Sequence, residues 1–299
     1  MDDLTALLEI RVHQPRAIAQ AAARRTRRES PVGPGGRLLI IAADHPARGV
    51  LRAGGQPLAM ANRMGLLDRL RVALSRPGVD GLLGTPDVIE DLLLLDTLDG
   101  EPVLDNKVVI GSMNRGGLAG TAFEIDDRFT GYHAEALQRM RFDGGKMLFR
   151  IDPADPATVV TMQSCARAVD QLSERGLMAM VEPFISHRVD GRVHNDLSPE
   201  AVIRSLTVAS GLGITSAYTW LKVPVVNDME RVLAASTLPV LLLGGEVPAD
   251  PDATYRRWQE ALRLPTVRGL VVGRALLYPP DDDVAGAVDT AAGLLEEVR

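Results

Sequence analysis

The sequence is poor in the features that mark several large classes of protein. Its single cysteine, Cys165, excludes an internal disulfide and a cysteine-based zinc site. No stretch reaches the roughly 18 apolar residues that a membrane-spanning helix needs. The acidic N-terminus is not typical of a signal peptide. We therefore expect a cytoplasmic protein that has no membrane partner.

Clustered positive charge is scarce as well. The chain has 299 residues and a formal net charge of -6, and its one dense basic run, Arg24–Arg28, is typical of the polar end of a helix. Because nucleic-acid-binding domains present a basic surface, we expect no nucleic acid partner. Hydrophobic residues make up 46% of the chain, which is ample for a large core.

Apolar runs and helical segments alternate along most of the chain. Residues 4–28 have roughly helical spacing of apolar residues, and a cluster of proline and glycine over 30–36 ends that helix. Eight strand-like runs follow, over 38–43, 79–83, 108–113, 146–151, 177–181, 218–223, 240–243 and 269–272. Helical periodicity follows each run, over 62–76, 86–98, 131–141, 156–174, from Ser198 onward, and over 227–235, 252–263 and 284–298.

These eight units predict a (β/α)8 TIM barrel over residues 37–299, preceded by an N-terminal helical extension over residues 1–36. The runs are rich in valine, isoleucine and leucine, as parallel strands covered by helices are. Eight units in about 260 residues match the usual size of such a barrel. A doubly wound open sheet is the alternative, but no Gly-x-Gly-x-x-Gly turn follows the first run. We see no linker that would separate two domains.

Lys222 lies inside the sixth run, where a charged residue is costly. Alternation places it on one strand face with Tyr218 and Trp220, and Pro224 ends the strand. A buried ammonium must be paired, solvated in a cleft or neutralised by a lowered pKa. A neutral amine in a cleft is a nucleophile toward carbonyl groups. By itself the stretch favours a paired structural lysine.

Other polar residues gather at the carboxyl ends of the predicted strands, where TIM barrels place their active sites. Asp44 follows the first run, Glu182 follows the fifth, and Lys146 begins the fourth. A second ammonium within about 6 Å would lower the pKa of Lys222, and Glu182 could shuttle protons. Asp44 could accept the proton of a substrate hydroxyl. A structural ion pair between Lys146 and Glu182 is an equally good interpretation.

Glycines after the last two strands predict a phosphate site. Gly244, Gly245 and Gly273 would let backbone N–H groups approach an anion, and Arg274 could add a bidentate contact. The position matches the usual phosphate site of this fold, although tight turns alone would also explain the glycines.

Three further residues are predicted to contact substrate: Arg150, Arg115 and His45. His45 could instead act as an acid or base, or only orient its loop. The polar residues between His187 and Asp196 have no spacing typical of a metal site, so we expect a solvated rim there. We expect no metal and no other cofactor.

Six short motifs resemble, in order, the strand motifs of class I aldolases. They are Ala42–His45, Gly144–Arg150, Met180–Pro183, Trp220–Pro224, Leu243–Val247 and Val272–Ala275. The group unites deoxyribose-phosphate, archaeal-type fructose-bisphosphate and tagatose-bisphosphate aldolases. The branch of tagatose-bisphosphate and sulfofructose-phosphate aldolases looks most similar, because of the early lysine in the fourth run and the Glu-Pro pair after the fifth.

The resemblance implies a TIM barrel and a metal-independent Schiff-base mechanism. By position, Lys222 matches the Schiff-base lysine, Lys146 the second active-site lysine, Glu182 the strand-five carboxylate and Asp44 the first-strand aspartate. Gly245, Gly273 and Arg274 fall where the family holds a phosphate or sulfonate. His45 departs from the glutamine that related enzymes often have, and Asn114–Gly117 matches no family motif, so the substrate is less certain than the chemistry.

The sequence therefore predicts a class I aldolase that acts on a small phosphorylated or sulfonated carbonyl compound, either a keto-sugar or a keto-acid. We expect a homo-oligomer. Two alternatives stay open. One is a phosphate-binding barrel isomerase in which Lys222 is only an electrostatic stabiliser, and the other is a non-catalytic sugar-phosphate sensor.

Overall fold

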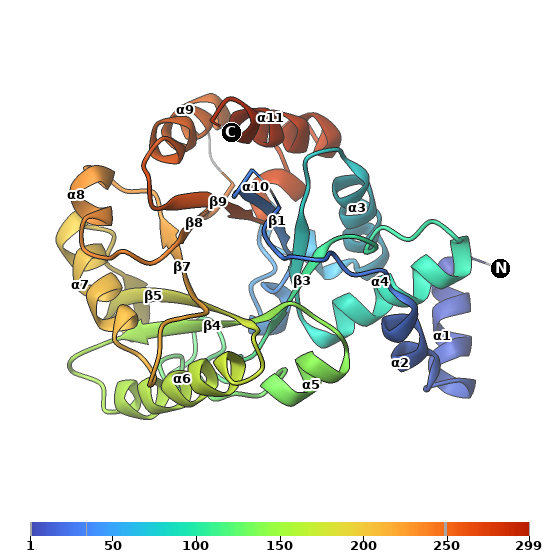
Figure 1. Cartoon of the computed structure of the whole chain (residues 1–299), viewed down its shortest axis with the longest axis horizontal. Coiled ribbons are helices and arrows are strands. Elements are labelled where there is room, and N and C mark those ends of the chain that lie inside the picture. The colour runs from blue at the N-terminus through green and yellow to red at the C-terminus, as the bar shows by residue number, and fades with distance from the viewer. Residues whose placement is uncertain (1, 34, 248–249, 299) are drawn as a thin grey trace.

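The computed structural model describes residues 2–33, 35–247 and 250–298. Its centre is a closed barrel of parallel strands (Figure 1). In spatial order these strands are β1 Leu38–Ala42, β2 Gly81–Gly84, β3 Val108–Ser112, β4 Gly144–Ile151, β5 Met178–Val189, β7 Thr219–Pro224, β8 Val240–Leu243 and β9 Val267–Val272. Pairing of β9 with β1 closes the barrel, which confirms the predicted TIM barrel and rules out an open sheet.

Helices surround the barrel and cover the outer faces of the strands (Figure 1). They are α3 Arg63–Ser75, α4 Pro86–Asp99, α5 Ala134–Arg139, α6 Ala157–Ser173, α7 Pro199–Ser210, α8 Met229–Leu233, α9 Pro251–Leu262, α10 Arg274–Leu277 and α11 Val284–Glu296, with short 3-10 turns η1 Pro46–Arg48 and η2 Ala59–Ala61. Proline opens α4, α7 and α9, where a missing N–H costs nothing. No described helix has the length and apolar character to cross a membrane.

The single helix predicted over residues 4–28 is wrong. The chain forms two helices there, α1 Asp3–His13 and α2 Ala17–Arg24. Pro15 lies between them, and proline inside a helix removes one hydrogen bond and clashes with the preceding turn. Both helices contact α4 on the outside of the barrel (Figure 1).

The basic run that follows α2 packs across the end of the barrel where the strands begin. Arg25 is buried and donates hydrogen bonds to the main-chain carbonyls of Leu104, Lys107 and Arg141. Arg27 pairs with Asp143 at 2.8 Å, and Arg28 pairs with Asp80 at 2.9 Å. The charges of these three arginines are therefore engaged by carbonyl and carboxylate groups of the same chain.

The barrel interior is a packed core beneath the strand ends. Its buried side chains include Leu38, Ile40, Leu83, Val108, Met180 and Leu241. Trp220 packs against this cluster. Because residues two apart share a strand face, Lys222 also projects to the inside, nearer the carboxyl end of β7.

The fifth strand extends well beyond its predicted end at residue 181. β5 continues to Val189 and pairs with the antiparallel strand β6, Arg192–Asn195. Asp190 and Gly191 connect them with φ of 49° and 78°. Asp-Gly between two strands is a strong signal for a type I′ hairpin turn, so the sequence held this information.

Gly269 supports a prediction about stability. Its φ is 131°, and an added Cβ would lie 1.9 Å from the carbonyl oxygen of Leu38 on β1. We expect Gly269→Ala to lower the free energy of unfolding by about 3 kcal/mol or more, through backbone strain and separation of β9 from β1. Chemical denaturation measures the change. The control Gly293→Ala, in α11 with open space at its Cβ, should stabilise slightly. Equal effects of the two substitutions would contradict the prediction.

Candidate active site

A cavity of about 450 Å³ opens at the carboxyl ends of the barrel strands. All but one of the predicted site residues line it: Asp44, His45, Lys146, Arg150, Glu182, Lys222, Gly244, Gly245, Gly273 and Arg274. These residues come from six of the eight barrel strands or from the turns that follow them. Closure of the barrel is what brings them together.

Arg115 is the exception, and its predicted place in this cavity is wrong. It lines a separate, smaller hollow beside Arg63 and Asp87. The chain after β3 pairs with a later part of the same connection, through a bridge between Asn114 and Phe129. The Asn114 side chain points inward to β4, so alternation directs the next side chain away from the cavity.

Four buried charges form a continuous chain at the bottom of the cavity. Lys146 Nζ lies 2.9 Å from Asp44 Oδ2 and 2.5 Å from Glu182 Oε2. Lys222 Nζ lies 2.8 Å from Glu182 Oε1. The two lysines are only 2% and 4% exposed. Positive and negative groups alternate, so the cluster is neutral as a whole and each buried charge has an opposite neighbour.

The two lysines have opposite pKa shifts. Burial is the largest influence on both and acts to lower the pKa. At Lys146, two carboxylates, Asp44 and Glu182, outweigh burial and raise the pKa above its ordinary value. At Lys222, burial and the nearby Lys146 ammonium outweigh Glu182, and the pKa falls. Lys222 therefore becomes a free amine more readily than Lys146 does.

The two carboxylates stay ionised. Burial acts to raise the pKa of Glu182, but Lys146 and Lys222 outweigh it and lower the pKa to about 2. Asp44 is held well below its ordinary pKa, mainly because Lys146 more than offsets its burial. In the absence of substrate at neutral pH, the cluster thus has two carboxylate anions and one protonated lysine, Lys146.

His45 lies on the wall of the cavity beside Asp44. Its Nδ1 is 3.9 Å from Asp44 Oδ1, and burial lowers its pKa to about 4, so the ring is neutral at neutral pH. An added Cβ on Gly273 would meet the Ala42 carbonyl oxygen at 2.3 Å and His45 Cε1 at 2.9 Å. Only glycine lets the end of β9 approach the end of β1 so closely.

The glycine turns and Arg274 line the part of the cavity next to His45. Arg274 donates to the carbonyl oxygens of Arg52 and Gly245 at 3.4 and 3.5 Å, and lies 3.7 Å from the exposed Glu246 carboxylate. Thr254 and Arg257 of α9 line the same cavity. Neither residue was predicted from the sequence, because only the packing of α9 decides which face of that helix lines the cavity.

Lysine is rare outside this site. The chain has 33 basic residues, and only three of them are lysines: Lys107, Lys146 and Lys222. Arginine cannot lose its proton in a protein, whereas lysine can. Two of the three lysines therefore lie in one cavity, and both contact Glu182.

The two histidines of the β5–β6 hairpin stack on each other. His187 and His194 face each other across the β5–β6 hairpin with ring centroids 6.5 Å apart. Among the described residues, no group of three or more His, Cys, Asp or Glu side chains is placed to hold a metal ion.

The acid stability of the fold should depend on Glu182. A carboxylate whose folded pKa is lowered from 4.5 to about 2 contributes stability that is complete above pH 4.5 and is lost as pH falls toward 2. We expect Glu182→Gln to remove on the order of 3 kcal/mol of this pH-dependent stability. Denaturant unfolding between pH 2 and pH 6 measures it. Glu135→Gln, at an exposed carboxylate, should keep the wild-type slope, and the same slope in both variants would refute the assignment.

Comparisons with known proteins agree with this fold. A crystal structure of Cgl0159 from Corynebacterium glutamicum is 51% identical, with a TM-score of 0.94 over 99% of this chain and 97% of that one. An archaeal fructose-1,6-bisphosphate aldolase is 18% identical, with a TM-score of 0.63 over 94% and 99% of the two chains. The fructose-bisphosphate aldolase of Slackia heliotrinireducens is 16% identical, with a TM-score of 0.60 over 95% and 89%.

The aldolase similarities are low in identity and show a shared fold. The narrower resemblance to tagatose-bisphosphate and sulfofructose-phosphate aldolases stays a prediction. No curated protein matches the chain significantly. The model of the Cgl0159-like family matches residues 36–292, which is the whole barrel up to the last helix, and the chain belongs to that family.

Proposed function

We propose that this protein is a class I aldolase that cleaves or forms a carbon–carbon bond through a Schiff base on Lys222. The observation that carries the proposal is a buried lysine with a lowered pKa, at 2.8 Å from a carboxylate, inside the barrel cavity. A primary amine in this state is a nucleophile toward carbonyl groups. The fold is shared with an archaeal aldolase whose catalytic lysine carries the carbinolamine intermediate of its substrate.

Glu182 relays the proton of the Lys222 amine. Its Oε1 accepts a proton from Lys222, and the amine then attacks the carbonyl carbon of the substrate to give a carbinolamine. Glu182 returns the proton as the carbinolamine hydroxyl leaves as water, which produces an iminium ion. Lys146 holds the other oxygen of Glu182 and fixes its orientation.

The iminium ion makes carbon–carbon cleavage possible because it accepts the electron pair of the breaking bond. Asp44 or Glu182 takes the proton of the substrate hydroxyl, an aldehyde leaves, and an enamine stays on Lys222. Protonation of the enamine carbon and addition of water then release the ketone and restore the lysine. The firmly protonated Lys146 stabilises negative charge on the two carboxylates throughout.

The part of the cavity formed by the turns after β8 and β9 suits an anionic group on the substrate. We assign the phosphate or sulfonate to the turns at Gly244, Gly245 and Gly273, with Arg274 beside them. Arg257 and Thr254 line the same cavity and add a cation and a hydroxyl. Arg150 and His45 then face the remainder of a phosphorylated keto-sugar or keto-acid.

Borohydride trapping tests the proposal directly. The protein is incubated with dihydroxyacetone phosphate or another donor ketone, reduced with borohydride and digested for mass spectrometry. We expect a mass increment on the peptide that contains Lys222; with only three lysines in the chain, the assignment is simple. If no carbonyl donor forms an adduct with the protein, the proposal is wrong. Activity that disappears with a chelator would indicate a metal-dependent aldolase instead.

A further inference from the structure

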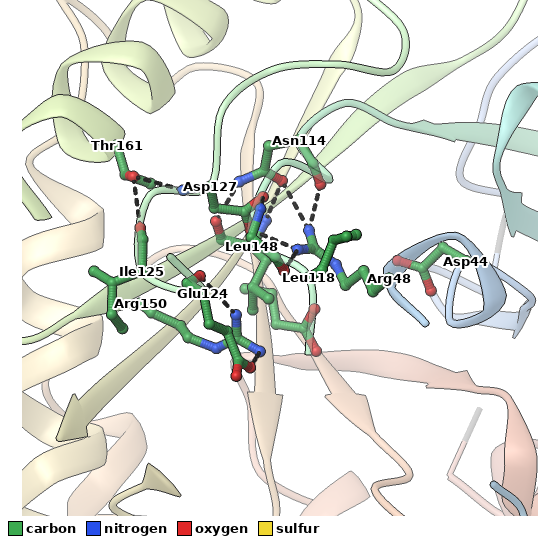
Figure 2. Close-up of polar contacts among 12 residues, drawn as sticks. Asp44, Arg48, Asn114, Leu118, Glu124, Ile125, Asp127, Leu148, Arg150 and Thr161 are labelled. Atoms are coloured by element: carbon green, nitrogen blue, oxygen red, sulfur yellow. Dashed lines mark hydrogen bonds and ion pairs between the residues drawn. The ribbon is translucent and has the colours of Figure 1, made fainter. Parts of the chain in front are cut away.

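Arg48 is a buried arginine that reaches away from the segment carrying Asp44 (Figure 2). It ends the short turn η1, four residues after Asp44. Its guanidinium donates to Asp127 Oδ2 at 2.6 Å and to the main-chain and side-chain oxygens of Asn114. Its own carbonyl accepts from the N–H of Ala119 at 2.9 Å. Arg48 therefore binds the connection after β3 through both side chain and main chain.

Asn114 carries this contact on to strand β4. β3 ends at Ser112, so the following part of β4 lacks a strand partner on that side. The Asn114 side chain replaces it: Oδ1 accepts from the N–H of Leu148 at 2.8 Å, and Nδ2 donates to the Leu148 carbonyl at 2.5 Å. Leu148 lies between Lys146 and Arg150, so Asn114 fixes the part of β4 that carries both.

Asp127 anchors the other side of the network. Its Oδ1 accepts from the N–H of Gly117 at 3.2 Å, and its own N–H donates to Thr161 Oγ1 on α6 at 3.3 Å. Thr161 in turn donates to the Ile125 carbonyl at 3.1 Å. Asn114, Asp127 and Thr161 are at most 2% exposed. The network is thus a rigid buried link from the β1 loop to β4 and α6.

We propose that Arg48 is a positioning residue that holds Asp44 against Lys146. The catalytic meaning of this role rests on the proposed aldolase function, but the geometric claim does not. Asp44 lies on the β1 segment and Lys146 on β4, and their 2.9 Å contact joins two elements. Arg48 and Asn114 form the second join between the same two elements, and Figure 2 shows them reaching from the Asp44 segment to Leu148.

The chemistry of the guanidinium explains why arginine is needed here. One planar group serves four acceptors on three residues in fixed directions: Asp127 Oδ2, the Gly117 carbonyl and the two oxygens of Asn114. Lysine would keep the charge but not the fork. Methionine would fill a similar volume, leave Asp127 as an uncompensated buried anion, and free the turn that follows Asp44.

Competitive labelling of amines tests the role without a substrate. Each variant is treated with trace acetic anhydride beside an added model amine, and the rates at Lys107, Lys146 and Lys222 are read by mass spectrometry across pH. When Asp44 moves away from Lys146, the pKa of Lys146 falls, because the nearby Asp44 carboxylate raises it. Arg48 itself lowers the pKa of Lys146, but by less than Asp44 raises it. We therefore expect Arg48→Met to increase Lys146 labelling by about tenfold, the effect of one pKa unit on the fraction of free amine. Arg48→Lys should give an intermediate increase, and Asn114→Ala should act in the same direction.

Two controls separate positioning from lost stability. Arg25→Met removes an equally buried arginine at the opposite end of the barrel, bonded to the Lys107 carbonyl, and should alter labelling of Lys107 but not of Lys146. The double variant Arg48→Met with Asp127→Asn removes the carboxylate that Arg48→Met leaves unpaired. It should recover thermal stability but keep the fast Lys146 labelling. Wild-type Lys146 labelling in Arg48→Met, measured well below its unfolding temperature, would overturn the inference. Borohydride trapping on the wild type decides the aldolase function separately.

Discussion

We expect the Lys222→Met variant to lose carbon–carbon bond cleavage by at least about 10⁴-fold, because the nucleophile of the proposed reaction is gone. Borohydride should no longer trap any donor on the protein. The fold should survive, since methionine replaces a buried ammonium with an apolar chain of similar length and Glu182 keeps Lys146 as its partner. Turnover assays, trapping and thermal unfolding on the same preparation measure the three effects.

Lys222→Arg is the stricter form of this experiment. Arginine keeps the positive charge opposite Glu182 but cannot form a Schiff base at neutral pH. The aldolase proposal requires the arginine variant to be as inactive as the methionine variant. Measurable activity in Lys222→Arg would show that the residue is only an electrostatic stabiliser, as in a barrel isomerase. Lys107→Met is the matched control, because Lys107 donates to the Val79 carbonyl outside the cavity, and it should retain wild-type kcat.

Glu182→Gln should reduce kcat by about 10² to 10³-fold, the usual contribution of a positioned acid or base. Glu182 contacts both lysines, at 2.5 and 2.8 Å, so its neutralisation leaves two buried ammoniums with Asp44 as the only anion of the cluster. Breaking a buried ion pair in this way should cost about 3 kcal/mol or more of folding stability at neutral pH. The variant should nevertheless fold at moderate temperature.

The pH dependence of trapping gives Glu182→Gln a sharper signature. Glu182 raises the pKa of Lys222, so its loss should lower that pKa further and move half-maximal trapping to a lower pH. Turnover would fall while the covalent adduct persists. The control Glu246→Gln neutralises an exposed carboxylate near Arg274 on the same cavity and should change neither the trapping profile nor stability. A shift of half-maximal trapping to higher pH would contradict the assigned role.

The strand motifs were predictable because the hydrophobic pattern that marks them lies in neighbouring residues. Hydrophobic runs repeat eight times, and several of them end in Asp44, Glu182 or a glycine turn. A closed barrel then brings all the strand ends to one rim. The same reasoning failed at Arg115, where the chain pairs with itself after β3 and turns the side chain outward. It failed also for the N-terminal helix, where one proline outweighed a long helical pattern.

The sequence by itself determined the barrel and most of the polar groups at its mouth, since both follow from periodicity and strand order. The resemblance to class I aldolases matched Lys222 to the Schiff-base lysine, but the sequence did not show why this lysine loses its proton more readily. The pKa values of Lys146 and Lys222 move apart because Lys146 contacts two carboxylates and Lys222 contacts one. Contacts of Arg48 with Asn114 and Asp127, far away along the chain, likewise exist only after folding. Electrostatic energies depend on distance and burial in space, and tertiary structure alone decides both.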